Sequence, residues 1–442
     1  MGQGLILKMS KPALVLPYRK RLIFLLATLL VSFSLACVSG IPGIGRQQNV
    51  SPSPDVVESG AASSDEPSAI IKNTPETTEN IVNTSGETDL AGQQILILPG
   101  SEPPTFDPHL SSDATSAEYV VEIFSGLMAY DPELNLIPDI AESYQISDDG
   151  LVYTFKIKPA ARFQDGKSIR AKDFKWSFER ACDPATGSYT ADTYMGDIAG
   201  CRDKLQGQAG AVAGVKVVDD LTLQLTIDEP KSFFLAKMSY PTAYVLDQEN
   251  VESDPAWSTH PNGSGPFRLA QAGQNKVVLR KNDNYYRDPK PILDRVIYLI
   301  NAPIDLMTGY EHGLPEDIIT SYELPEGSTY DIIPVSLADF YRATDPHNVL
   351  SREFTSSKSL NVFYIAFNVK KPPFDDVKIR QAFNLALDKP RIVKLMYHNT
   401  TPIANGIVPP GIPGYENPDL SDHQFDPERA RQLITESSYG DV

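Results

Sequence analysis

The sequence contains few of the side chains that usually carry out chemistry. Among its 442 residues there are only 3 cysteines, 2 tryptophans and 6 histidines. The histidines are far apart in the chain and lack the spacing of metal ligands. No glycine-rich phosphate loop, HExxH, GxSxG or paired CxxC motif occurs. The sequence therefore predicts neither an enzyme nor a protein that holds a metal ion or another cofactor.

Positive charge and long apolar runs are also scarce. The chain has 39 Lys and Arg against 57 Asp and Glu, a formal net charge of −18. Nucleic acids and anionic membrane surfaces repel such a protein, so neither is expected to bind the folded part. The main apolar run covers residues 22–36. It is shorter than the roughly 20 residues that a membrane-spanning helix needs.

The first 37 residues have the pattern of an export signal. Basic residues between Lys8 and Arg21 precede the short apolar run, which is the usual order in secretory signals. The run ends in Ser34-Leu35-Ala36-Cys37, which resembles a bacterial lipobox, although Leu is usual where Ser34 stands. We expect Cys37 to carry a lipid that anchors the protein to the outer face of the cell membrane. The alternative is cleavage elsewhere, with Cys37 removed or left as a plain thiol.

Two cysteines remain once Cys37 is assigned. Cys182 and Cys201 belong to a chain that is expected to be exported into an oxidising environment, where a pair of cysteines favours a disulfide. Two buried free thiols are the alternative.

The segment 38–92 has the composition of a flexible tether. It is rich in Ser, Thr, Pro, Gly and Asn, and its apolar residues follow no period. Such a segment cannot bury enough apolar surface to offset the entropy lost on folding. We expect it to join the anchor to a folded part that begins near Gln93.

Regular apolar patterns begin at residue 95 and predict both strands and helices. Alternation predicts a strand over Leu151–Ile157 and a hairpin over Gly214–Ile227, while Phe174, Phe178 and Ala181 have helical spacing. Further strands are expected at Ile95–Leu98, Val277–Asn282, Val296–Ile300 and Asn361–Asn368. Helices capped by Asp375, Asp388 and Asp426 are expected near the C-terminal end, with Ala382, Phe383, Ala386, Leu387, Ala430, Leu433 and Ile434 on apolar faces.

Several of these segments together resemble one protein family. They are SEPPTFDP, FSGLMAYD, IPDIAESYQISDDGLVYTFKIKPAARFQDGKS and DFKWSFERACDP, followed by the GSGPF turn and the VVLRKNDNYY segment. The last two depart from the family pattern at Phe267, Asp283 and Tyr286. The family is that of the extracytoplasmic solute-binding proteins of ABC importers, of the peptide and nickel class.

The resemblance implies an α/β fold with two lobes, mixed sheets and a hinged cleft, as in periplasmic binding proteins. It places the first lobe at 93–313, with an inserted subdomain, and the second at 314–442. Family members continue beyond the point that corresponds to Val442, so we expect a C-terminally truncated chain with an incomplete second lobe.

The resemblance also implies a function. We expect a monomeric receptor, lipid-anchored or periplasmic, that captures oligopeptides and delivers them to a permease with ATPase subunits. Another solute, such as a nickel complex or an oligosaccharide, remains open, as does a solute-sensing co-receptor. The candidate ligand-binding residues are aromatic and amide side chains in turns and strand ends, namely Phe106, Tyr240, Tyr244, Phe267, Phe367 and Asn368. Each of them is at least as well explained by core packing.

Overall fold

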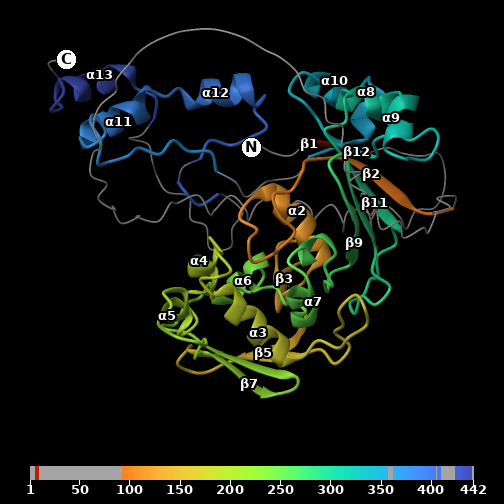
Figure 1. The fold of residues 1–442 in the computed structure, drawn as a ribbon. Helices are drawn as coiled ribbons and strands as arrows, with labels where there is room; N and C mark the ends of the chain where they lie inside the picture. The colour runs from red at the N-terminus through yellow and green to blue at the C-terminus, as the bar shows by residue number, and fades with distance from the viewer. Residues whose placement is uncertain (1–4, 9–91, 357–361, 405, 410–423, 441–442) are drawn as a thin grey trace, which may run out of the picture. The chain divides into compact units, whose positions relative to one another are not determined.

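The computed structural model describes residues 5–8, 92–356, 362–404, 406–409 and 424–440. Cys37, the apolar run at 22–36 and the tether at 38–92, apart from Gly92, lie outside these residues. In the described part, strands form four sheets that helices cover, so the predicted α/β class is confirmed (Figure 1). No helix within it has both the length and the apolar character that crossing a membrane requires.

The first sheet joins strands from distant parts of the chain. In order across the sheet, its strands are β2 (Ile95–Gly100), β11 (Arg295–Ile300), β10 (Lys276–Lys281) and β9 (Phe267–Ala272). The first two run parallel, with Ile97 beside Ile297, and the other neighbours run antiparallel. The strands predicted at 95–98, 277–282 and 296–300 are thereby confirmed.

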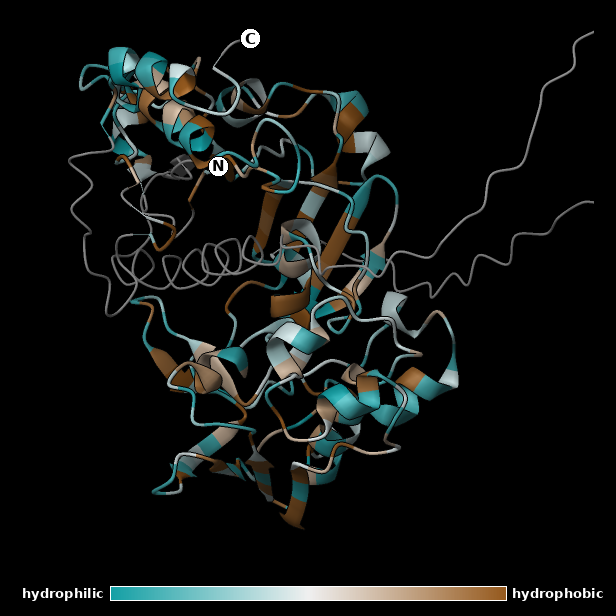
Figure 2. Ribbon diagram, turned by 90° about the vertical axis from the view of Figure 1, so that its left-hand side faces the viewer, coloured by the Kyte–Doolittle hydropathy of each residue, from teal (hydrophilic) through white to brown (hydrophobic). Residues whose placement is uncertain are grey.

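Strand β11 of this sheet is buried on both faces. Alternate residues of β11, Val296, Tyr298 and Ile300, join an apolar cluster with α2 (Ala114–Ile123). The residues between them, Ile297 and Leu299, join a second cluster with α8 (Leu306–Glu311) and α9 (Glu316–Ser321). A strand covered on both faces is mostly apolar, and in β11 only Arg295 is charged, in agreement with the mostly brown strands of Figure 2.

The second sheet is antiparallel and has one covered face. Its order is β5 (Ala141–Ile146), β6 (Val152–Ile157), β8 (Thr222–Thr226) and β7 (Val215–Asp219). Phe155 and Leu223 lie opposite each other on adjacent strands, fully buried, and pack in one cluster with Phe174 and Phe178 of α3 (Ala171–Ala181). The predicted strand, hairpin and helix are therefore confirmed.

Shorter elements connect and extend these two sheets. They are the pair β3 (Met128–Tyr130) and β4 (Leu136–Pro138), with α4 (Ala191–Met195), α5 (Cys201–Leu205), α6 (Phe234–Lys237), η2 (Pro241–Ala243), α7 (Gln248–Ser253), η3 (Trp257–Thr259), α10 (Phe340–Thr344) and η4 (Val349–Arg352).

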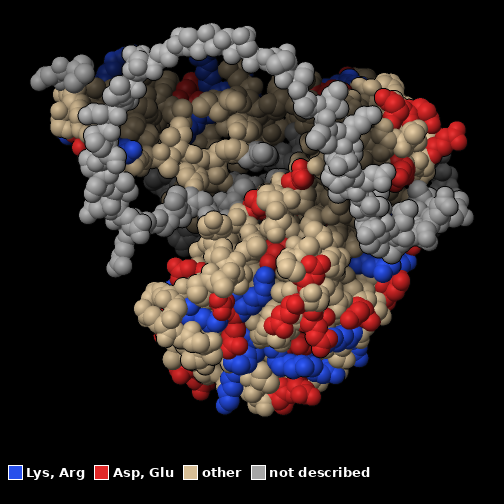
Figure 3. Space-filling model, in the orientation of Figure 1, with Lys and Arg blue, Asp and Glu red and all other residues tan. Residues whose placement is uncertain are grey.

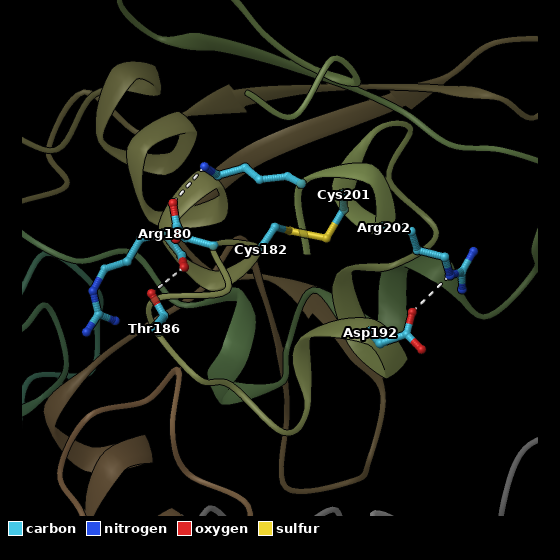
Figure 4. The surroundings of a disulfide bond; sticks show 8 residues. Arg180, Cys182, Thr186, Asp192, Cys201 and Arg202 are labelled. Carbon is cyan, nitrogen blue, oxygen red and sulfur yellow. Dashed lines mark hydrogen bonds and ion pairs between the residues drawn. A yellow bond between two sulfur atoms is a disulfide. The ribbon is translucent and has the colours of Figure 1, made fainter. Parts of the chain in front are cut away.

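A disulfide holds α5 against the end of α3. Cys182 caps the C-terminus of α3 and Cys201 begins α5; their sulfur atoms are 2.07 Å apart (Figure 4). The loop between them is tied down further, since the Thr186 hydroxyl donates to the Arg180 carbonyl at 2.7 Å and Arg202 donates to Asp192 at 2.9 Å. The two cysteines expected to pair are thus joined in the structure.

A third sheet takes its central strand from the N-terminus. Its order is β12 (Ile332–Pro334), β1 (Leu5–Lys8) and β13 (Phe354–Ser356). The central strand is antiparallel to both neighbours, with Leu7 opposite Ile333 on one side and Phe354 on the other. This strand lies inside the segment that the sequence predicts to be an export signal.

The prediction of a strand at Asn361–Asn368 is wrong for residues 362–368, the part that the structure describes. These residues belong to no sheet. The apolar pattern is present, but residues 362–368 pair with no strand in the described part of the chain. Large side chains in this segment are consequently exposed, with Phe363 at 59%, Tyr364 at 64% and Ile365 at 65%.

Three helices complete the described chain: α11 (Val377–Ala386), α12 (Lys389–Met396) and α13 (Pro427–Thr435). A small core of Ala382, Leu385, Ala430 and Leu433 joins the first and last of them. The caps expected at Asp388 and Asp426 are confirmed, whereas Asp376, and not Asp375, caps α11.

Not all of the residues expected on apolar faces are buried. Phe383 and Ile434 are 50% and 43% exposed, because the two helices meet through Leu385 and Leu433. Ala386 and Leu387 also lie outside that small core.

Candidate functional site

The segment between β2 and α2 is fixed by a buried ion pair. Arg180 of α3 donates to both carboxylate oxygens of Asp107, at 2.6 and 3.2 Å. Asp107 also accepts the backbone N–H of His109 at 2.9 Å, and its carboxylate is almost fully buried. A two-pronged contact of this kind sets the orientation of both groups. The SEPPTFDPHL segment is therefore held rigidly against α3.

His109 is part of the same network and is held neutral. Burial lowers its pKa to about 4, although the charge of Asp107 acts in the opposite direction. Its Nδ1 accepts from Arg180 at 2.9 Å, so Nε2 carries the proton and donates to the Tyr244 carbonyl at 3.2 Å. Both ring nitrogens are engaged and the ring has no exposed surface. His109 is thus placed to support the loop and not to act as a base.

The GSGPF turn packs directly on the C-terminal end of α2. The N–H groups of Ser264 and Gly265 both donate to the Ile123 carbonyl, at 3.0 and 2.8 Å. A Cβ on Gly263 or Gly265 would lie 2.1 Å from the Ile123 oxygen or 2.4 Å from the Glu122 oxygen. Only glycine allows this approach. The motif is a scaffold that sets the position of α2 over the first sheet.

Two carboxyl groups of α2 lie one turn apart in a largely apolar environment. Glu122 is 3% exposed, and its Oε1 has no hydrogen-bond partner among the described residues. Burial, with a smaller effect of Glu118, raises the pKa of Glu122 to about 8. Burial also raises the pKa of Glu118 to about 7. At neutral pH, Glu122 is therefore mostly a neutral acid that can donate one hydrogen bond.

Asp139 is another buried carboxyl group, and it has compensating partners. Tyr286 donates its hydroxyl to Asp139 at 2.7 Å, and Arg287 is 3.6 Å from the same oxygen. The pKa of Tyr244 and of Tyr285 is raised, mainly by burial and further by the charges of both Asp139 and Glu122. Glu122 is the member of this group without a compensating charge among the contacts described.

Four of the six candidate ligand-binding residues are core residues in this structure. Phe106, Tyr244 and Phe267 belong to the cluster between α2 and the first sheet, with 8%, 8% and 1% of their surface exposed. Tyr240 is 2% exposed and stacks on Tyr194, with ring centroids 3.5 Å apart. Their burial agrees with the core-packing alternative, and their role in ligand binding stays a prediction.

The other two candidates lie in the segment that follows β13. The ring of Phe367 contacts Phe374 and Phe383, with centroids 4.8 and 5.5 Å apart, and keeps part of its surface. The exposed side chain of Asn368 accepts the backbone N–H of Lys370 at 3.1 Å. The structure does not bring these two residues together with the four buried rings.

Sequence reasoning did not single out the acids of α2 or the Asp107–Arg180 pair. The sequence does contain an indication of the two acids of α2. The segment AEYVVEIF places Glu118 and Glu122 four residues apart in an otherwise apolar helix, where charge is unfavourable. The ion pair joins residues 73 apart, which no local pattern indicates.

No metal site is found among the described residues. Nowhere in them do three His, Cys, Asp or Glu side chains gather as a metal site would require. On the face shown in Figure 3, Lys and Arg alternate with Asp and Glu over α3 and α7, without a field of one sign.

The fold is similar to those of solved solute-binding proteins. The oligopeptide-binding protein OppAIV of Borrelia burgdorferi superposes with a TM-score of 0.62 at 28% identity, covering 78% of this chain and 66% of its own. Listeria monocytogenes OppA bound to peptide gives 0.60 at 25% identity, covering 78% of this chain and 68% of its own. The fold is that of the periplasmic binding proteins.

A family assignment follows from the sequence. Residues 135–442 match the family described as bacterial extracellular solute-binding proteins, family 5 Middle. The chain belongs to this family. It is also 26% identical to the glutathione-binding protein GsiB of Escherichia coli strain K12 over 351 residues, which is 79% of this chain. That match spans 62% of the length of GsiB. These relatives are binding proteins and not enzymes.

Proposed function

We propose that the protein is a receptor of an ABC importer that captures oligopeptides outside the cell membrane and delivers them to a permease. The observation that carries the proposal is the family match over 135–442. It is supported by relatives that bind glutathione or a peptide, as their names state. Transport would draw its energy from ATP hydrolysed by partner subunits, and this chain would perform no covalent step.

Peptide capture by a two-lobed protein relies on closure around the solute. We propose 93–313 and 314–442 as the two lobes, with the ligand enclosed where they meet. Closure is favoured when the ligand makes better contacts in the closed state than in the open one. Closure of this kind needs lobes that keep their own shape. The Asp107–Arg180 pair and the glycine turn on α2 would keep the first lobe rigid.

Phe367 and Asn368 are the ligand contacts we propose among the six candidates. Both keep exposed surface, and together they offer an aromatic face and an amide that can bond a peptide backbone. Phe106, Tyr240, Tyr244 and Phe267 would act indirectly, by supporting the first lobe.

The location of the receptor follows from its N-terminus. We propose that residues 1–36 direct export, that Cys37 carries the lipid anchor and that 38–92 is the tether. A monomer on such a tether samples the space just outside the membrane, where solute and permease both lie.

Identification of the ligand carried by the native protein tests the function. The protein is purified from its own cells, denatured, and the released small molecules are identified by mass spectrometry. Short peptides are the expected result. A nickel complex or an oligosaccharide would instead place it with receptors for another solute. Deletion of the gene should abolish peptide uptake; loss of a signalling response with uptake intact would identify a sensory co-receptor.

A further inference from the structure

The third sheet contains a strand that the exported protein would lose. β1 supplies the centre of this sheet and pairs with β12 and with β13. Its residues 5–8 precede the apolar run of the proposed export signal. Removing them would leave two facing strand edges about 10 Å apart, twice the usual spacing between strands. Such edges are reactive toward any free strand.

A strand-like segment without a partner follows β13 directly. Residues 362–367 read VFYIAF, a composition of β-branched and aromatic residues that favours strands. Phe363, Tyr364 and Ile365 are each more than half exposed, although large apolar residues normally lie inside a fold. The segment therefore has a strand's sequence and no sheet.

Chain direction allows this segment to fill the place of β1. β12 and β13 are both antiparallel to β1, so they run parallel to each other. A strand that turns back after β13 in a hairpin runs antiparallel to β13 and thus to β12 as well. Five residues, 357–361, separate the end of β13 from Val362, which is within the range of hairpin loops of about 2–5 residues.

We propose that β1 is a placeholder strand, and that Val362–Ile365 replaces it between β12 and β13 once the export signal is removed. The proposal rests on residues 1–36 being an export signal, as proposed above. In the precursor, the N-terminal strand keeps the third sheet closed while the segment after β13 stays outside it. After the signal is removed, Val362–Ile365, the segment that follows β13 in the sequence, completes the sheet.

The register of the replacement follows from the loop length. With Val362 as the first paired residue, it lies opposite Ser356 and Tyr364 lies opposite Phe354, in the places that Leu5 and Leu7 hold now. Tyr364 would then also face Ile333 of β12, whose buried side chain belongs to the cluster with α8 and α9. Ile365 would take the place of Lys8, opposite Ile332.

This exchange would delay the last step of folding until after export. A precursor with Phe363, Tyr364 and Ile365 exposed is less compact than the processed protein and has a lower barrier to unfolding for transport. Removal of the signal then couples processing to completion of the second lobe.

Hydrogen exchange on the full chain tests the replacement without any need for cleavage. Ile6→Pro removes a backbone donor from the middle of β1, which a central strand does not tolerate. We expect the amides of Val362–Ile365 to exchange freely in the unaltered chain and to gain protection of about 100-fold or more in Ile6→Pro. Ile6→Val, which keeps the donor, is the matched control and should leave them unprotected.

The amides of β11 report whether each variant is folded. Adding Ile365→Pro to Ile6→Pro should abolish the gained protection. If β11 stays protected in Ile6→Pro while Val362–Ile365 exchange as fast as before, the proposal is overturned. If Ile6→Pro does not fold, the protein recovered after export provides the same comparison, and unprotected Val362–Ile365 there would equally refute it. The intact mass of that protein shows separately whether residues 1–36 were removed.

Discussion

Arg180 and Asp107 form a two-pronged ion pair that links α3 to the loop between β2 and α2, across 73 residues of sequence. The Asp107 side chain is 5% exposed and that of Arg180 17%. The guanidinium also lies over the Trp257 ring, 5.4 Å from its centroid. The pair holds in place the segment from which α2 begins, and with it the helix that carries Glu118 and Glu122.

Breaking this pair should destabilise the first lobe strongly. Asp107→Asn keeps the size of the side chain but leaves the Arg180 charge buried without compensation, which costs about 3–5 kcal/mol. Urea unfolding measures the change. The same substitution in an exposed pair, Asp192→Asn opposite Arg202, should cost less than about 1 kcal/mol. Equal losses of unfolding free energy in the two variants would show that the buried pair stabilises the protein no more than an exposed pair does.

Glu122 should make the protein less stable as the pH rises. Its pKa is about 8 when folded, against an ordinary value of 4.5, so between these values the folded state binds more protons than the unfolded state. Stability from this residue is full below about pH 4.5 and is lost as the pH rises through about 8. Glu122→Gln should therefore raise stability by a few kcal/mol at pH 8.5 and hardly at all at pH 4.

The pH series needs a carboxyl control. Glu133→Gln changes an exposed side chain and should alter the unfolding free energy by less than about 0.5 kcal/mol at either pH. Glu118→Gln should act in the same direction as Glu122→Gln, and its effect on stability should reach full size as the pH rises through about 7. A pH-independent effect of Glu122→Gln would contradict the account of this residue.

The disulfide should contribute to stability by restricting the unfolded chain. Its cysteines are 19 residues apart, and closing a loop of this size stabilises by about 3 kcal/mol in the chain-entropy model. The double variant Cys182→Ser, Cys201→Ser should lose that amount in a denaturant titration, and Cys37→Ser should lose none. Two additional reactive thiols in the denatured, unreduced protein would show that the bond does not form.

Cys37 should be the site of lipid attachment. Cells fed a labelled fatty acid should yield labelled protein, and Cys37→Ser should abolish the label and release the protein from the membrane. A soluble, unlabelled protein with Cys37 intact would show that the signal is cleaved elsewhere.

The sequence pattern predicted the strands of the first two sheets well, because the spacing of apolar residues within a single element is enough to predict each strand. Alternation in Leu151–Ile157 and Gly214–Ile227, and helical spacing in Phe174–Ala181, depend on which residues are buried within each element. The caps Asp388 and Asp426 are local too.

The third sheet and the ligand-binding residues could not be predicted in this way. Val362–Asn368 has a strand's pattern, but strand pairing joins segments far apart in the sequence, such as β1 with β12 and β13, and no local pattern indicates such partners. Aromatic side chains such as Phe106 and Phe267 serve a core and a binding surface equally well, and only burial distinguishes the two.

Isothermal titration calorimetry with the exported protein, freed of bound ligand, tests peptide binding most directly. Peptides of two to six residues, an oligosaccharide and a nickel–histidine complex are titrated in turn. We predict saturable binding of the peptides, one per chain, and none of the other two solutes. Saturable binding of the sugar or the nickel complex with no heat from any peptide would contradict the account.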